Sequence, residues 1–100
     1  MNLSDNELLI LQNFFAAKPV KKAYLFGSSA RNEASKFSDI DILVELDHST
    51  PIGMNFFTYQ PELELLLKKK VDLLTSEGLS KYVKPHIDKD KILIYERTHD

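Results

Sequence analysis

Residues 38–44 read SDIDILV, a run of aliphatic side chains interrupted by two aspartates. Alternate residues of a strand face the same side, so the even-numbered aliphatic residues would share one face, with Asp39 and Asp41 on the other. The two carboxylates would lie roughly 6–7 Å apart along the strand, where like charges repel in a partly desolvated site. A hard divalent cation with oxygen ligands, such as Mg²⁺, resolves that conflict. The alternative is a turn at residues 38–39 followed by a solvated edge aspartate.

A third aspartate lies in a second short apolar run, VDLL at residues 71–74. An ionised carboxylate in such a strand is costly unless it faces water, a cation or a ligand. If this strand is the neighbour of the strand that holds Asp39 and Asp41, the three carboxylates form one cluster. Otherwise Asp72 is a lone aspartate on an edge strand.

The segment GSSAR at residues 27–31 follows another predicted strand. A strand that ends in Gly-Ser and turns into a short helix presents free backbone N–H groups, which favour a phosphate. Gly27 would allow close approach of the backbone, while Ser28 and Arg31 would add a hydroxyl donor and positive charge. Ser29 would be either a further phosphate contact or the cap of a short helix. The segment matches neither a Walker A loop nor G-x-G-x-x-G, and an ordinary turn is the alternative.

Length and composition bound the class of protein. One hundred residues that are 43% hydrophobic, with a net charge of −2 and no cysteine, predict one globular domain spanning residues 1–100. The lack of cysteine excludes a disulfide scaffold, a zinc ribbon and a thiol nucleophile. No apolar run approaches the ~20 residues of a membrane span, and Asp5 stands where a signal peptide would be basic. We therefore expect a cytoplasmic protein with no membrane contact, and the near-neutral charge predicts no direct DNA binding.

Periodicity and chain breakers predict alternating helices and strands. Ser4 and Glu7 have the spacing of a capping box before an amphipathic helix, and Pro61 would divide or kink a long apolar stretch. Helical spacing also begins at Leu79, with Ser80 as a possible cap and Pro85 as an obstacle. The predicted order is helix 5–17, strand 21–26, strand 39–46, helical stretch 53–70, strand 71–75, helix 79–87 and strand 91–95. This order predicts an α/β (α+β) fold in which helices cover a mixed four-stranded sheet.

Together these pieces resemble the signature of the nucleotidyltransferase superfamily related to DNA polymerase β. Ten residues separate Gly27-Ser28 from Asp39-x-Asp41, which is the spacing of that signature. The fuller run resembles the minimal nucleotidyltransferase (MNT) branch, and the resemblance covers about residues 20–96. The similar segments are 26–31, 38–44, 71–74 and 92–96. The resemblance implies the nucleotidyltransferase fold.

The resemblance also implies roles for individual residues. The nucleotide-binding residues would be Gly27, Ser28, Ser29 and Arg31, and the catalytic, metal-binding residues would be Asp39, Asp41 and Asp72. The three aspartates would hold two Mg²⁺ ions, and Asp72 would activate an acceptor hydroxyl that attacks the α-phosphorus of ATP as pyrophosphate leaves. Many members carry glycine after the motif arginine, where this chain has Asn32, and the departure bears on triphosphate affinity.

In the MNT branch the usual partner is a HEPN-domain toxin. The resemblance therefore implies an antitoxin that transfers AMP from ATP to a hydroxyl of that toxin, which is a tyrosine in some members. The apolar content of residues 53–67 fits a partner surface or, equally, the protein's own core. Two alternatives remain. One is transfer to a small molecule such as an aminoglycoside, although relatives with that activity generally carry an extra domain, and the other is a non-catalytic antitoxin that masks its partner.

Overall fold

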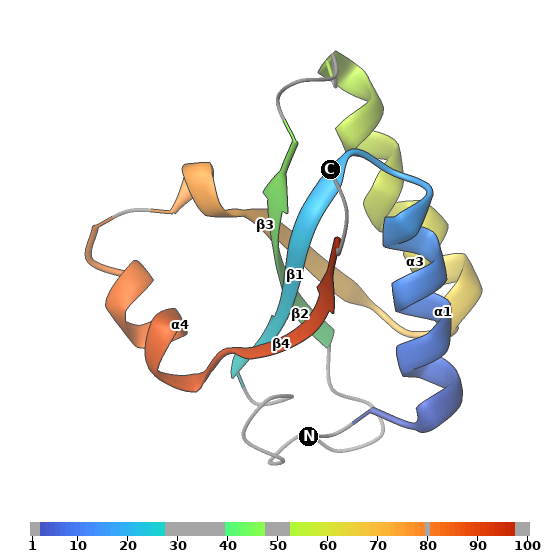
Figure 1. The fold of residues 1–100 in the computed structure, drawn as a ribbon, viewed down its shortest axis with the longest axis horizontal. Coiled ribbons are helices and arrows are strands. Elements are labelled where there is room, and N and C mark those ends of the chain that lie inside the picture. The colour runs from blue at the N-terminus through green and yellow to red at the C-terminus, as the bar shows by residue number, and fades with distance from the viewer. Residues whose placement is uncertain (1–2, 28–39, 48–52, 80, 98–100) are drawn as a thin grey trace.

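A mixed β-sheet lies at the centre of the molecule. The computed structural model describes residues 3–27, 40–47, 53–79 and 81–97. The four strands are ordered β3-β2-β1-β4 across the sheet (Figure 1). They are β1 (Val20–Phe26), β2 (Ile40–Leu46), β3 (Val71–Thr75) and β4 (Ile92–Glu96). β1 is antiparallel to both β2 and β4, whereas β2 and β3 are parallel, so the predicted mixed four-stranded sheet is confirmed.

Two helices, α1 (Asp5–Ala16) and α3 (Tyr59–Leu67), lie side by side over one face of the sheet (Figure 1). Leu11 and Phe15 of α1 and Leu63 of α3 are completely buried in the core, and each contributes about 1.5–3 kcal/mol through burial. The strand residues of the same core are Val20, Ala23, Leu25, Ile40, Ile42, Val44, Val71, Leu73 and Ile94. The even-numbered aliphatic residues of β2 therefore face the core, as predicted. In the part of the chain that the structure describes, every helix is too short or too polar to cross a bilayer.

The apolar stretch before β3 is divided, as the position of Pro61 indicates. A 3₁₀ helix, η1 (Gly53–Thr58), precedes α3, which begins at Tyr59. Pro61 is therefore in the first turn of α3, where the missing proline N–H would have had no intrahelical partner. The proline is tolerated because the helix begins just before it.

The predicted start of the last helix is wrong. The helix α4 spans Lys84–Asp90 and does not include Leu79, where the helical spacing begins. Pro85 is in the first turn, the part of a helix that tolerates proline, so the helix begins close to the proline instead of running through it. The predicted cap, Ser80, lies outside the described residues. Figure 1 shows α4 on the other side of the sheet from α1 and α3.

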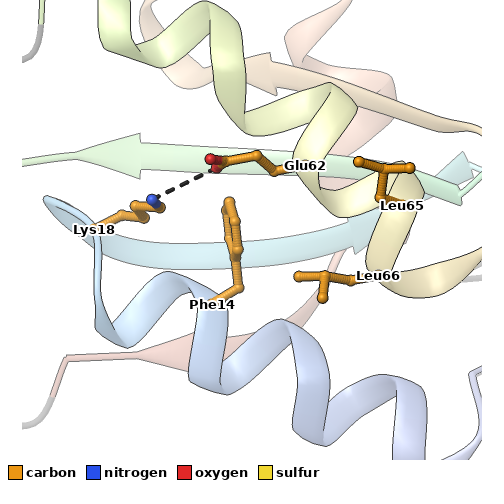
Figure 2. Close-up of a pocket in the computed structure, with 5 residues that line it drawn as sticks. All are labelled: Phe14, Lys18, Glu62, Leu65 and Leu66. Atoms are coloured by element: carbon orange, nitrogen blue, oxygen red, sulfur yellow. Dashed lines mark ion pairs between the residues drawn. The ribbon is translucent and has the colours of Figure 1, made fainter.

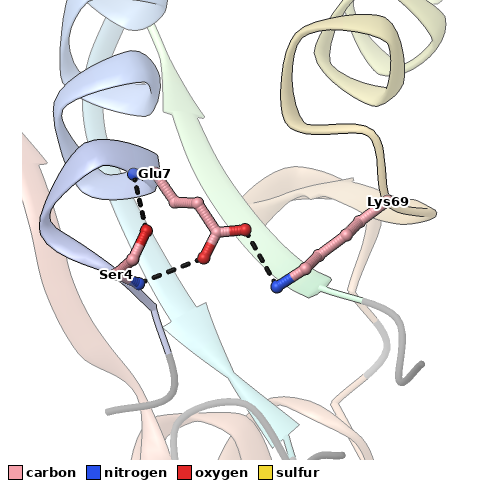
Figure 3. A network of polar contacts seen from close by, with 3 residues as sticks. All are labelled: Ser4, Glu7 and Lys69. Atoms are coloured by element: carbon pink, nitrogen blue, oxygen red, sulfur yellow. Dashed lines mark hydrogen bonds and ion pairs between the residues drawn. The ribbon is translucent and has the colours of Figure 1, made fainter. Parts of the chain in front are cut away.

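The start of α1 is tied to the turn that precedes β3. Ser4 and Glu7 form the predicted capping box, with both reciprocal hydrogen bonds at 3.1 Å (Figure 3). The free oxygen of the Glu7 carboxylate pairs with Lys69 Nζ at 2.9 Å. Burial raises the pKa of Glu7, but the bonds from Lys69 and Ser4 together outweigh it, so the pKa lies below its ordinary value of 4.5. One carboxylate therefore caps a helix and binds a lysine of the neighbouring turn.

The Glu7→Gln variant is expected to lose the pH-dependent contribution of Glu7 to the free energy of unfolding. Because the folded pKa is lowered, the ionised form stabilises the fold fully above pH 4.5, and this contribution is lost as the pH falls through the lower folded value. Gln can still cap the helix, and the Lys69 side chain keeps 29% of its surface in solvent, so the loss at neutral pH should be about 1 kcal/mol. Urea unfolding of the wild-type and Glu7→Gln proteins, measured from neutral pH downward, should show that their free energies of unfolding converge in acid. A difference that stays constant with pH would contradict this role of Glu7.

Candidate functional site

The sheet face opposite α1 and α3 carries two of the predicted carboxylates. Asp41 on β2 and Asp72 on β3 are direct partners in the parallel register. The residue pairs on either side of them are core residues, so alternation directs both aspartates to the opposite face. Neighbouring strands lie about 4.8 Å apart, which places the two residues next to each other. The sequence left open whether these strands are neighbours, and the structure shows that they are.

Gly27 brings the end of β1 against Asp41. Its φ angle is +68°, in the left-handed region, and a Cβ atom placed on it would lie 2.7 Å from Oδ2 of Asp41. The preceding residue, Phe26, is the register partner of Asp41 in the β1–β2 pair. The absence of a side chain at Gly27 therefore makes room for the carboxylate. The segment predicted to bind phosphate begins directly beside Asp41.

The two aspartates differ in their exposure to solvent. Asp72 is exposed, whereas Asp41 is half-buried. Adjacent carboxylates supply the oxygen ligands that Mg²⁺ prefers, so the donor chemistry of this pair fits the predicted metal. Among the described residues no three His, Asp or Glu side chains are grouped to hold a metal ion. The other predicted site residues lie outside the described residues: Ser28, Ser29, Arg31 and Asp39, together with Asn32.

An aromatic and aliphatic row crosses the same face beside the carboxylates. Tyr24 of β1 is the register partner of Leu43 on β2 and of Leu93 on β4. The Tyr24 hydroxyl donates to Glu45 at 3.3 Å, and Lys91 Nζ lies 4.3 Å from the ring centroid. Burial and the nearby Glu45 carboxylate raise the pKa of Tyr24, so its hydroxyl stays protonated at neutral pH. Leu43 is buried at 2% exposure whereas Leu93 is 47% exposed, so this row is covered next to Asp41 and opens to solvent toward β4.

Two side chains that the sequence reasoning missed contact the strand that carries Asp72. Glu64 Oε2 accepts a hydrogen bond from the N–H of Val71 at 3.0 Å, and Gln60 Oε1 accepts one from the N–H of Leu73 at 3.1 Å. Both acceptors belong to α3 and lie four residues apart. That spacing is visible in the sequence, but it becomes informative only once β3 is known to be an edge strand beside α3.

A separate groove lies in the helical layer, between α1 and α3 (Figure 2). Its volume is about 370 Å³, and its lining residues are Phe14, Lys18, Glu62, Leu65 and Leu66. Lys18 Nζ lies 3.5 Å from Glu62 Oε2 and 5.0 Å from the centroid of the Phe14 ring. Because Asp41 and Asp72 lie on the other face of the sheet, this groove is not part of the carboxylate site.

The sequence matches a known family over most of its length. The family model described as "Polymerase beta, Nucleotidyltransferase" matches residues 10–100. A protein of Methanocaldococcus jannaschii named as a protein adenylyltransferase is 43% identical over 76 residues, which are 75% of this chain and 76% of that protein. The match includes the strands that carry Asp41 and Asp72, since both lie within residues 10–100.

Solved structures have the same fold. The structure of a minimal nucleotidyltransferase matches with a TM-score of 0.74 and 25% identity, over 87% of this chain and 88% of that one. A chain in the structure of a tri-AMPylated Shewanella oneidensis HEPN toxin in complex with an MNT antitoxin matches with a TM-score of 0.71 and 18% identity. That match covers 95% of this chain and 74% of the other. The chain therefore belongs to the polymerase β-type nucleotidyltransferase family.

Proposed function

We propose that this nucleotidyltransferase is a protein adenylyltransferase that transfers AMP from ATP to a tyrosine hydroxyl of a HEPN-domain toxin and so acts as its antitoxin. The observation that carries the proposal is the adjacency of Asp41 and Asp72, with Gly27 against Asp41. The protein adenylyltransferase similar to this chain supports AMP as the transferred group. The HEPN–MNT complex with the same fold supports the kind of partner.

The reaction joins the acceptor oxygen to the α-phosphorus of ATP. The bond from the α-phosphorus to the bridging oxygen breaks, pyrophosphate leaves, and the acceptor hydroxyl loses its proton. Asp72, the exposed carboxylate, lies where an incoming hydroxyl can reach it, so it orients that hydroxyl and favours loss of the proton. Asp41 is half-buried next to Gly27, so in this proposal it would lie toward the phosphates of ATP.

Asp41 and Asp72, with Asp39 as the third ligand, would hold Mg²⁺. When bound there, the metal neutralises the charge that builds up on the phosphate oxygens in the transition state. The nucleotide-binding residues of the proposal are Gly27, Ser28, Ser29 and Arg31. Backbone N–H groups, hydroxyls and a guanidinium are suited to hold a triphosphate against the carboxylates.

Exposed apolar residues support a protein as the acceptor. Met54, Phe57 and Leu65 are 77%, 69% and 81% exposed, although they belong to the apolar stretch that could have been entirely core. The interpretation that this whole stretch belongs to the core is therefore wrong. Contiguous exposed apolar patches are typical of surfaces that bind another protein, and these three exposed side chains would contribute to such a patch. They would give the proposed toxin a place to bind.

The test is co-expression with the protein encoded by the neighbouring reading frame, followed by addition of Mg²⁺ and each nucleoside triphosphate in turn. Intact-protein mass spectrometry should show the partner gaining one or more AMP units with ATP, and peptide fragmentation should place them on tyrosine. A parallel reaction with an added aminoglycoside tests the alternative, and AMP found on that small molecule and not on the partner would favour a small-molecule transferase. Tight binding without any mass gain, unaffected by substitution of Asp41, would favour an antitoxin that only masks its partner.

A further inference from the structure

We infer that Gln60 and Glu64 of α3 are positioning residues for Asp72, an inference that rests on the proposed function of the carboxylate site. Asp72 lies between the two residues whose backbone N–H groups these side chains bind. Asp72 is on an edge strand of five residues, and among the strands in the described part of the chain β3 pairs with β2 alone. An edge strand exposes unpaired N–H groups on its outer side, and parallel pairing is slightly less stable per residue than antiparallel pairing. Without further contacts, the segment that presents Asp72 would be the least restrained part of the sheet.

The geometry of α3 matches that of the strand edge. The chain reverses at Lys68, whose φ of +56° is left-handed, so α3 and β3 run in opposite directions. Glu64, near the end of the helix, therefore meets Val71, near the start of the strand, and Gln60 meets Leu73. Four helical residues rise about 6 Å and two strand residues about 6.6 Å. The two acceptors consequently reach successive outward N–H groups.

The two hydrogen bonds limit the movement of Asp72 from both sides. Residues 71 and 73 have side chains in the core and outward N–H groups bound by α3. The strand can therefore neither slide along β2 nor lift at this point without breaking a bond. We conclude that α3 acts as a fixed third neighbour for the Asp72 peptide, holding the carboxylate beside Asp41.

If Gln60 and Glu64 only stabilised the fold, substituting them would have different effects from those expected of positioning residues. Gln12 of α1 offers a matched control because its Nε2 donates to the carbonyl of Ile94 at 3.1 Å, on the strand at the opposite edge of the sheet. That bond also joins a part-buried helix side chain to an edge strand, but β4 carries none of the proposed ligands. If edge bonds contribute only stability, substitutions at Gln12, Gln60 and Glu64 should act alike.

The experiment compares Gln60→Leu and Glu64→Leu with Gln12→Leu, using the full chain. Two readouts are needed: Mn²⁺ affinity measured by calorimetry without nucleotide, and kcat for AMP transfer. We expect the two α3 variants to lose up to about 10-fold in metal affinity and in kcat, the lower end of the loss for contacts made directly to metal ligands, because these bonds reach Asp72 through the backbone. Gln12→Leu should lower the melting temperature similarly and leave both readouts unchanged. Gln60→Glu and Glu64→Gln keep an acceptor oxygen and should restore most of the affinity.

Equal behaviour of all three leucine variants would overturn the inference. If a leucine variant does not fold, the alanine variant at the same position is measured in its place, because it leaves the N–H group to water. If the wild-type protein transfers no AMP but the α3 variants still lose Mn²⁺ affinity selectively, the positioning role stands and the proposed function fails. If transfer is normal and the α3 variants match Gln12→Leu, the proposed function stands and the positioning role fails.

Discussion

Asp41→Asn is expected to lower the rate of AMP transfer by at least about 10²-fold while leaving the fold intact. The side chain is half-buried next to Asp72, and its oxygen approaches the backbone of Gly27, so it lies between the second carboxylate and the proposed phosphate turn. Asparagine keeps the shape but removes the negative charge, and an amide is a much weaker ligand for a hard cation. The fold should tolerate the change because it also removes the repulsion between two adjacent carboxylates. Initial rates by mass spectrometry and urea unfolding together measure both expectations.

Glu96→Gln is the control for loss of a carboxylate elsewhere in the sheet. Glu96 ends β4 and makes an exposed ion pair with Lys22 at 3.4 Å, which contributes little to stability. This variant should transfer AMP at the wild-type rate. An Asp41→Asn protein with the same rate as Glu96→Gln would show that the carboxylate pair is not the catalytic site.

Gly27→Ala is expected to impair both stability and transfer. A φ of +68° costs a residue with a Cβ atom roughly 1–2 kcal/mol, and this Cβ would also lie 2.7 Å from Asp41 Oδ2. Either the turn or the aspartate must move, so we expect at least a ~10-fold loss of kcat in addition to the loss of stability. Urea unfolding and initial rates would separate the two effects.

Gly78→Ala is the matched control for Gly27→Ala. A Cβ atom on Gly78 would lie 3.2 Å from Thr75 Oγ1, and its φ is not in the left-handed region. The threonine hydroxyl accepts an exposed hydrogen bond from the Gly78 N–H at 3.2 Å, so yielding by a few tenths of an ångström weakens one exposed bond at most. Stability should therefore change little, and kcat should stay at the wild-type value. A Gly27→Ala protein that retains full activity would contradict the proposed role of this glycine beside Asp41.

Local patterns in the sequence predict most of the fold. The alternation in residues 40–44 identifies the core face of β2, because alternate side chains of a strand share one face, although Leu43 on the opposite face is buried as well. The start of α4 is predicted wrongly because helical spacing and Pro85 conflict, and the observed helix begins beside the proline. The sequence likewise predicts that the stretch before β3 divides near Pro61, but only the packing shows that Tyr59 is the first residue of α3.

The site is predicted less completely than the fold. The sequence identifies Asp41 and Asp72 as unusual strand residues. Strand order is a property of the tertiary structure, so the sequence alone could not predict that the two aspartates are adjacent. The contact of Gln60 with β3 depends on the reversal at Lys68 and on β3 being an edge strand. The apolar residues of η1 and α3 could have been core or surface, because hydrophobicity alone does not state which side of a helix faces the sheet.

The parallel register of β2 and β3 links correct folding to assembly of the carboxylate site. A slip of β3 by one residue would turn Asp72 toward the helices and place its charge in the apolar interior, while Val71 and Leu73 would face water. Burial of an unpaired carboxylate costs several kcal/mol, so a chain with this misaligned strand would be too unstable to stay folded. The alignment that builds the core is therefore the same one that assembles the carboxylate pair, and a well-folded but misassembled enzyme should not accumulate.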